Sequence, residues 1–140
     1  MSEETLFPTS DDDELLISVY RKQGRTLDDL PYTPEFVAIA DALGAETLGA
    51  RASLFHRLHN LRKASKLPRL GKAAATRPRI DPAQEKLLAI EVEQAVGSLS
   101  LRDRLPYTVQ FDRVVERFNA SAGLQLSPHD VWRLIAKLAK

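Results

Sequence analysis

Cysteine is absent from the 140 residues of this chain, which excludes disulfides, thiolate metal sites and a cysteine nucleophile. No apolar run approaches the roughly 18 residues that a membrane-spanning helix needs, so we expect no membrane span. The N-terminal segment is acidic and has no basic and apolar leader, which predicts an intracellular, cytoplasmic protein. Apolar residues make up 44% of the chain and charged residues 28%, a composition typical of a globular protein.

Acidic residues are missing from one long window, although the net charge of the whole chain is only +1. Residues 1–50 hold eleven acidic and three basic residues, residues 51–80 hold nine basic and no acidic ones, and residues 81–140 hold eight of each. The net charges of the three segments are therefore −8, +9 and 0. A stretch of unopposed positive charge attracts polyanions such as nucleic acid.

A four-residue motif occurs twice in the chain. Leu-Pro-Tyr-Thr stands at residues 30–33 and again at 105–108. After each motif, apolar residues recur with the i, i+3, i+4, i+7 spacing that places them on one face of a helix. They are Phe36, Ile39, Ala40 and Leu43 in the first copy, and Phe111, Val114, Val115 and Phe118 in the second. The paired patterns predict an internal repeat.

Each copy predicts three helices and no strand, because no segment alternates apolar and polar residues between turn signals. The first helix of each copy ends at a glycine, and a threonine caps the start of the second helix. A residue suited to the left-handed conformation marks where the second helix is expected to end. In chain order, these markers are Gly24, Thr33 and Gly44 in the first copy, and Gly97, Thr108 and Asn119 in the second.

We therefore predict an all-α protein made of two tandem three-helix modules. The first module covers residues 11–64 and the second covers residues 83–140. A basic linker rich in proline and alanine joins them at residues 65–82, and residues 1–10 form a disordered acidic N-terminus. Because a core of 50 to 60 residues is marginal in size, we expect the modules to dock on each other.

The third helix of the first copy separates apolar from basic residues. Leu54, Leu58 and Leu61 share one side of this helix, and no acidic residue stands on the other side. That other side carries His56, His59, Asn60 and Lys63, flanked by Arg57 and Arg62. In the second copy, Arg133, Lys137 and Lys140 take the positions of His56, Asn60 and Lys63. Asparagine and basic side chains suit the base edges that the major groove presents.

A three-helix unit with a basic last helix resembles the helix-turn-helix family in its tri-helical forms, Myb/SANT-like or winged-helix-like. The resemblance is one of layout and covers nearly the whole chain in two copies. Trp132 in the last helix is similar to the aromatic anchor of Myb and SANT modules. The resemblance implies that the third helices enter the major groove of double-stranded DNA. The candidate nucleic-acid-binding residues are His56, Arg57, His59, Asn60, Arg62, Lys63, Lys66, Arg69, Arg133, Lys137 and Lys140.

The sequence also allows functions other than DNA binding. The acidic and basic segments predict, as an alternative, a protein-interaction module or a homo-oligomer held by opposite charges. RNA in place of DNA is left open. His56 and His59 have the spacing of two metal ligands, but no third ligand stands at a suitable distance in sequence, so we expect no metal. Without a glycine-rich phosphate loop or a nucleophile motif, we expect no cofactor and no enzymatic activity.

Overall fold

A computed structural model describes residues 11–70 and 77–140, and every regular element in these two ranges is a helix, as predicted. The predicted disordered N-terminus, residues 1–10, lies outside the described residues. In chain order the elements are α1 (Asp11–Gln23), η1 (Leu27–Asp29), α2 (Pro34–Ala42), α3 (Leu48–Lys63), α4 (Pro82–Val96), η2 (Leu99–Arg104), α5 (Val109–Ala122) and α6 (Pro128–Leu138), where η denotes a short 3₁₀ helix. The first four and the last four elements thus have the same order.

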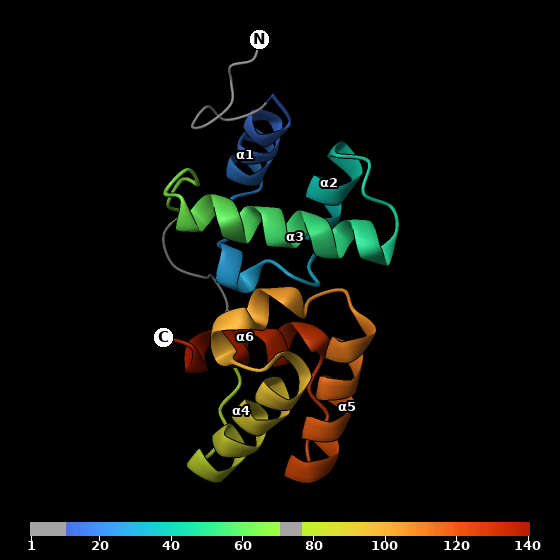
Figure 1. The fold of residues 1–140 in the computed structure, drawn as a ribbon, viewed down its shortest axis with the longest axis vertical. Coiled ribbons are helices and arrows are strands. Elements are labelled where there is room, and N and C mark those ends of the chain that lie inside the picture. Colours follow the sequence, from blue (N-terminus) through green and yellow to red (C-terminus); the bar gives the residue numbers. More distant parts are fainter. Residues whose placement is uncertain (1–10, 71–76) are drawn as a thin grey trace.

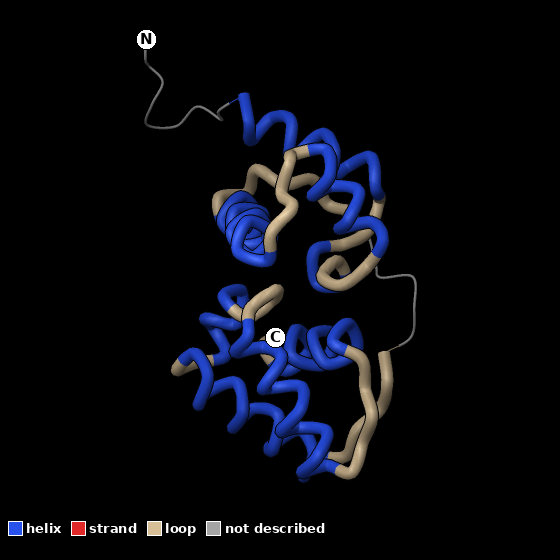
Figure 2. Tube along the Cα trace, turned by 90° about the vertical axis from the view of Figure 1, so that its right-hand side faces the viewer, coloured by secondary structure: helices blue, strands red, loops and turns tan. Residues whose placement is uncertain are grey.

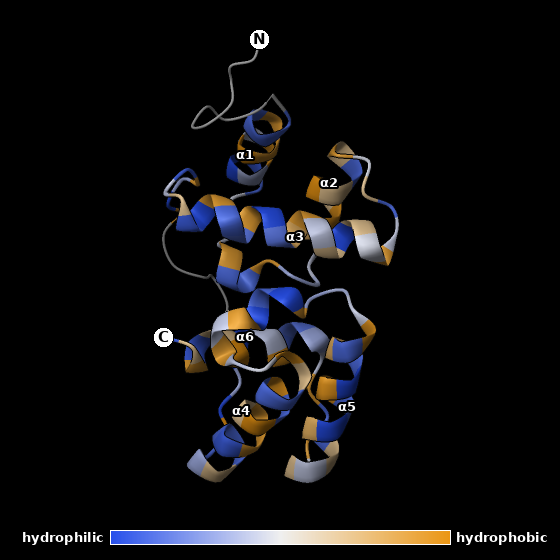
Figure 3. Ribbon diagram, viewed as in Figure 1, coloured by the Kyte–Doolittle hydropathy of each residue, from blue (hydrophilic) through white to orange (hydrophobic). Residues whose placement is uncertain are grey.

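The two halves lie one above the other along the long axis of the molecule (Figure 1). The α4 helix begins at Pro82, the last residue of the predicted linker. In the side view, loops and short helices meet between the halves, and the C-terminus lies near this boundary (Figure 2). Hydrophobic and hydrophilic residues are interleaved along the helices (Figure 3), as expected when each helix buries only one side. The buried side chains of both halves belong to one continuous core.

The second helices begin where their threonines predict. The hydroxyl groups of Thr33 and Thr108 accept hydrogen bonds from the backbone N–H groups of Phe36 and Phe111, both at 3.2 Å. This bond satisfies one of the free N–H groups at the start of α2 and of α5. The two helices therefore share the same N-terminal cap.

The second helices end differently, and the predicted end at Asn119 is wrong. In the first half, α2 ends as predicted and Gly44 follows in the left-handed conformation, with a φ of 73°. In the second half, α5 continues to Ala122, and Gly123 takes the left-handed position. Asn119 lies inside α5, and its side-chain amide bonds at 3.0 Å to both the N–H and the C=O of Leu126. Its polar side chain fastens a loop and does not end the helix.

The repeated tyrosines join the two halves directly. The backbone N–H of Tyr32 donates to the hydroxyl of Tyr107 at 2.6 Å, and the N–H of Tyr107 donates to the hydroxyl of Tyr32 at 2.5 Å. The two rings stack with centroids 4.4 Å apart. Both residues have a positive φ, 65° and 67°, which is uncommon and costly for a bulky side chain. The reciprocal bonds and the stacked rings offset that strain, and the pair forms a clasp between the halves.

Each third helix packs against the short 3₁₀ helix of the other half. The α3 helix contacts η2, and α6 contacts η1. At the boundary the Phe55 ring meets the Trp132 ring edge to face, with centroids 5.3 Å apart. The docking of the modules is thus observed, and the sides of α3 and α6 that it covers are no longer free to meet another molecule.

No helix within the described ranges is long and apolar enough to cross a membrane.

Candidate nucleic-acid interface

One side of α3 is open to solvent along the length of the helix. Ser53, Asn60 and Lys63 are exposed, and His56 and Arg57 are half-exposed between them. Leu54, Phe55 and Leu58 occupy the opposite side and are buried. We call Ser53, His56, Arg57, Asn60 and Lys63 the α3 strip. At 1.5 Å per residue, a helix of 16 residues is about 24 Å long, and no acidic residue stands on it.

His56 lies at the edge of the strip, where η2 of the second half reaches α3. Its Nδ1 atom is 2.6 Å from a carboxylate oxygen of Asp103, whose side chain is 2% exposed, whereas the His56 side chain is 45% exposed. The carboxylate thus fixes one ring nitrogen of the histidine and leaves the outer edge of the ring accessible.

Two arginines of α3 are paired with acidic residues of the first half. Arg57 donates to Asp13 at 2.5 Å, and Arg62 donates to Asp28 at 2.9 Å. Both pairs are partly exposed, so solvent screens them and each contributes little to stability. They matter for function because the carboxylates already neutralise two of the predicted phosphate-binding groups.

The prediction that His59 lies on the exposed side of α3 is wrong. Its side chain is 2% exposed and lies near Arg102 and Asp103 of the second half. Its burial, together with the neighbouring Arg62, lowers its pKa to about 4, so the imidazole is neutral at pH 7. The His59 Nε2 atom lies 3.0 Å from a guanidinium nitrogen of Arg62, and it therefore accepts this hydrogen bond. Nδ1 then carries the proton, and it has no partner among the described residues.

Arg133 is also not on the surface, which corrects its predicted role in reading DNA. It is 4% exposed, and its Nε atom lies 2.8 Å from the carboxylate of Asp29, which is itself buried. Arg25 and His129 bond to the same carboxylate at 2.6 and 2.9 Å. All residues of α6 from Val131 to Ala136 are buried, because η1 and the core enclose this helix. Only the end of α6 offers basic side chains to solvent, at Lys137 and Lys140.

The other candidate residues lie around the C-terminal end of α3. Lys66 is half-exposed and Arg69 is exposed on the segment that follows the helix. Lys140 comes from the end of α6 to within 3.1 Å of Asp28, the carboxylate that also pairs with Arg62. The structure therefore brings Arg62 and Lys140 together, although they stand in different halves of the sequence. Lys137 is exposed on α6 and, in the part of the chain that the structure describes, forms no ion pair with this group.

Arg104 is a basic residue that the sequence did not single out. It is exposed at the end of η2 and follows Asp103, which bonds to His56 at the edge of the strip. The sequence signal is weak, because residues 81–140 are balanced in charge and only the packing of η2 on α3 places Arg104 beside the strip.

A scan against protein-family models, a search of curated proteins and a search of solved structures gave no match. The internal repeat and the resemblance to helix-turn-helix modules both stay predictions.

Some charges of the acidic and basic segments pair with each other within the chain. Asp13 and Asp28 belong to the acidic first segment, and they bind Arg57 and Arg62 of the basic one. Self-association through the same charges would have to compete with these intramolecular pairs. Homo-oligomer formation and binding to another protein stay predictions.

The two histidines of α3 bond to different partners. Across residues 11–70 and 77–140, no group of three or more histidine or carboxylate side chains is arranged to hold a metal ion. His56 instead bonds to Asp103, and His59 bonds to Arg62.

Proposed function

We propose that this protein binds double-stranded DNA through the α3 strip. The observation that carries the proposal is the exposure of Asn60 and Lys63 on a 16-residue helix that has no acidic residue. An asparagine side chain forms two hydrogen bonds with the edge of adenine, and a lysine contacts guanine or a phosphate. The proposal differs from the sequence prediction because one helix, and not two, presents the reading surface.

The surroundings of the strip determine which groups supply phosphate contacts. Arg57 and Arg62 are paired with carboxylates, so bringing them to phosphates requires breaking those pairs. Lys63 in the strip and Arg104 on the neighbouring η2 are exposed, and within residues 11–70 and 77–140 neither forms an ion pair. We therefore infer that Lys63 and Arg104 make the larger electrostatic contribution to binding.

The experiment is a titration of a labelled DNA duplex at several salt concentrations with two matched double variants. One variant combines Lys63→Gln in the strip with Arg104→Gln on η2. The other combines Lys86→Gln and Arg117→Gln, which removes one lysine and one arginine from exposed positions on α4 and α5. The first variant should reduce the slope of log affinity against log salt by about 2, since each lost phosphate contact removes about 0.9. The second should leave the slope unchanged.

Three results would contradict the proposal. The first is no binding of the parent protein to duplex DNA at low salt, and the second is an equal loss of affinity in the two double variants, which would indicate contact without a defined surface. Tighter binding to an RNA duplex would also contradict it, because the major groove of RNA is too deep and narrow for side chains to read. A selection from random duplexes adds a test of base reading, in which Asn60→Ala should relax the preference of the parent at one position.

A further inference from the structure

A pocket of about 500 Å³ opens in the first half of the molecule, behind the C-terminal end of α3. It lies between α1, η1 and the segment that follows α3. Volumes of about 300–1,000 Å³ are typical of sites for small molecules. The pocket is distinct from the α3 strip, because none of the five strip residues lines it.

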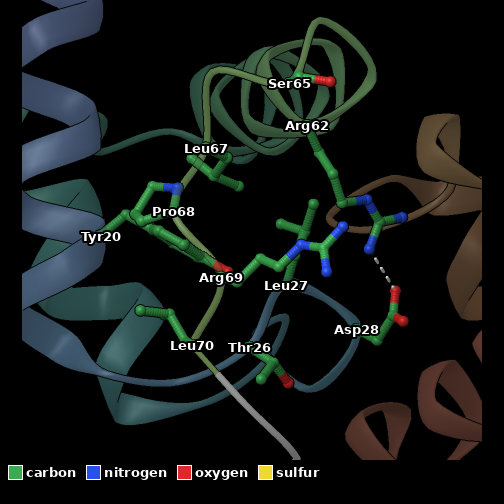
Figure 4. Close-up of a pocket in the computed structure, with 10 residues that line it drawn as sticks. All are labelled: Tyr20, Thr26, Leu27, Asp28, Arg62, Ser65, Leu67, Pro68, Arg69 and Leu70. Atoms are coloured by element: carbon green, nitrogen blue, oxygen red, sulfur yellow. Dashed lines mark hydrogen bonds and ion pairs between the residues drawn. The ribbon is translucent and has the colours of Figure 1, made fainter.

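The wall of the pocket is largely apolar. The Tyr20 ring, Leu27, Leu67 and Leu70 form this wall, together with Pro68. Figure 4 shows Tyr20, Leu67, Pro68 and Leu70 grouped on one side of the pocket. Leu67 and Leu70 lie in the predicted linker, yet they are packed against the hydrophobic core, which gives this segment a fixed position. A surface of this kind suits a flat, apolar part of a ligand.

Two guanidinium groups stand across from that wall. Arg62 and Arg69 both line the pocket, and Figure 4 shows their guanidinium groups pointing to the same side of it, away from Pro68. Arg62 donates to Asp28, and Arg69 forms no ion pair with a residue in the described ranges. The Thr26 side chain supplies a hydroxyl group at another edge of the pocket.

The charge at this end of the pocket is positive. Burial opposes the ionisation of Asp28, but hydrogen bonds and charge from Arg62 and Lys140 outweigh it and lower the pKa of the Asp28 carboxyl group. One carboxylate therefore balances only part of the charge of Arg62, Arg69 and Lys140. Guanidinium groups bind phosphate and carboxylate with planar, paired hydrogen bonds, so they select an anionic group.

We propose that this pocket binds a small organic anion, with its phosphate or carboxylate at the guanidinium groups of Arg62 and Arg69 and a flat apolar body against Tyr20 and Leu67. Both parts of the ligand follow from the lining, since an inorganic anion would leave the apolar wall uncovered and a neutral ligand would leave the guanidinium group of Arg69 without a counter-charge. The inference is independent of DNA binding, and it is tested without nucleic acid.

The test is titration calorimetry and amide NMR on the full chain with five probes. Adenosine 5′-monophosphate and benzoate combine an anionic group with a flat body, and they distinguish phosphate from carboxylate. Adenosine and benzyl alcohol are their neutral counterparts, and inorganic phosphate lacks the body. We expect at least one organic anion to bind at least tenfold more tightly than its neutral counterpart and than inorganic phosphate, with shifts at Thr26–Asp28 and Ser65–Leu70.

Matched variants separate the pocket from general surface charge. Arg69→Ala should weaken binding of the anionic probe by about tenfold, because one charge-assisted hydrogen bond is lost. Arg117→Ala removes an exposed arginine from α5 in the other half and should have no effect. The proposal is overturned if no organic anion binds at millimolar concentration, if neutral probes or inorganic phosphate bind as tightly, or if both variants bind like the parent or are weakened equally.

Discussion

The last helices of the two halves, α3 and α6, carry basic residues at matching positions but lie in different surroundings. On α3 the matching residue His56 is 45% exposed and reaches Asp103 at the edge of the open strip. On α6 the residue at that position, Arg133, is 4% exposed and lies against the buried Asp29. The comparison shows that matching basic positions are exposed to solvent on α3 and buried at the contact between the halves on α6.

The comparison also shows why α6 holds an arginine where α3 holds a histidine. A guanidinium group stays charged and has several donors, so it satisfies a buried carboxylate from within the core. A partly exposed histidine needs only one such contact, because water solvates the rest of its ring. The stability of the molecule should therefore respond unequally to changes at the two matching ion pairs.

The largest difference is expected from the two acidic partners. Asp29→Asn removes the charge that Arg133, Arg25 and His129 share, and it should lower the free energy of unfolding by about 3–5 kcal/mol, because the buried Arg133 loses the carboxylate at 2.8 Å, whereas that of Asp130 is 3.7 Å away. Asp103→Asn should cost about 1 kcal/mol, because its partner His56 is half-exposed. Urea denaturation at pH 7 measures both. Equal losses for the two variants would end the distinction between α3 and α6.

A somewhat smaller loss of stability is expected when the pH falls, and it comes from His59 on α3. The folded pKa of His59 is about 4, below the ordinary 6.5, so the unfolded chain binds a proton first as the pH falls. The contribution of the neutral imidazole is complete above pH 6.5 and is lost between pH 6.5 and 4, by about 3 kcal/mol in total. The arginines facing His59, Arg62 and Arg102, oppose its protonation, whereas Asp103 favours it.

Denaturation of the parent and of His59→Gln at intervals from pH 7.5 to pH 4.5 checks this dependence. The parent should lose stability over that range, and the variant should lose less, since glutamine accepts the bond from Arg62 without titrating. Asp28 does not disturb the comparison, because its lowered pKa places its loss of stability below pH 3.8. The same slope in both proteins would show that His59 is not the group that titrates.

The smallest effect is expected at the clasp, where the two halves should behave alike. Tyr32→Phe and Tyr107→Phe each remove a hydroxyl that accepts a backbone N–H from the other half. Each should lower the free energy of unfolding by about 1–2 kcal/mol, because a partly buried N–H group loses its partner while the ring stack remains. Thermal denaturation of the two variants measures the effect. A large loss in one variant and none in the other would show that the clasp is not symmetric in energy.

Much of the fold was predictable because its signals are local. Thr33 and Thr108 cap helices as predicted, and Gly24 and Gly97 follow the ends of α1 and α4 in the left-handed conformation. Asn119 misled the prediction, since its side chain satisfies a loop that comes close only in three dimensions. Both 3₁₀ helices were missed as well, because elements so short leave no periodic pattern in the sequence.

The candidate site was predictable only in part. The exposure of Asn60 and Lys63 agrees with the helical spacing of α3. The burial of His59 and Arg133 does not, because helical spacing identifies the side that faces away from a module's own core and is blind to a second module that covers it. Arg104 comes from η2, which only the docking of the halves brings to α3. The acidic residues that neutralise Arg57 and Arg62 come from α1 and η1, which meet α3 only when the first half folds.

The sequence by itself determined the helices, the caps that begin them, and the absence of acidic residues from α3, since each of these depends on residues within one or two turns of one another. The tertiary structure decided which basic residues reach solvent. That choice depends on how η1 and η2 cross the boundary to meet the opposite third helices, through contacts between residues such as His56 and Asp103, 47 positions apart, and His129 and Asp29, 100 positions apart. A charged group is buried only where oppositely charged or hydrogen-bonding partners surround it. Here those partners are distant in sequence, so no local sequence pattern identifies them.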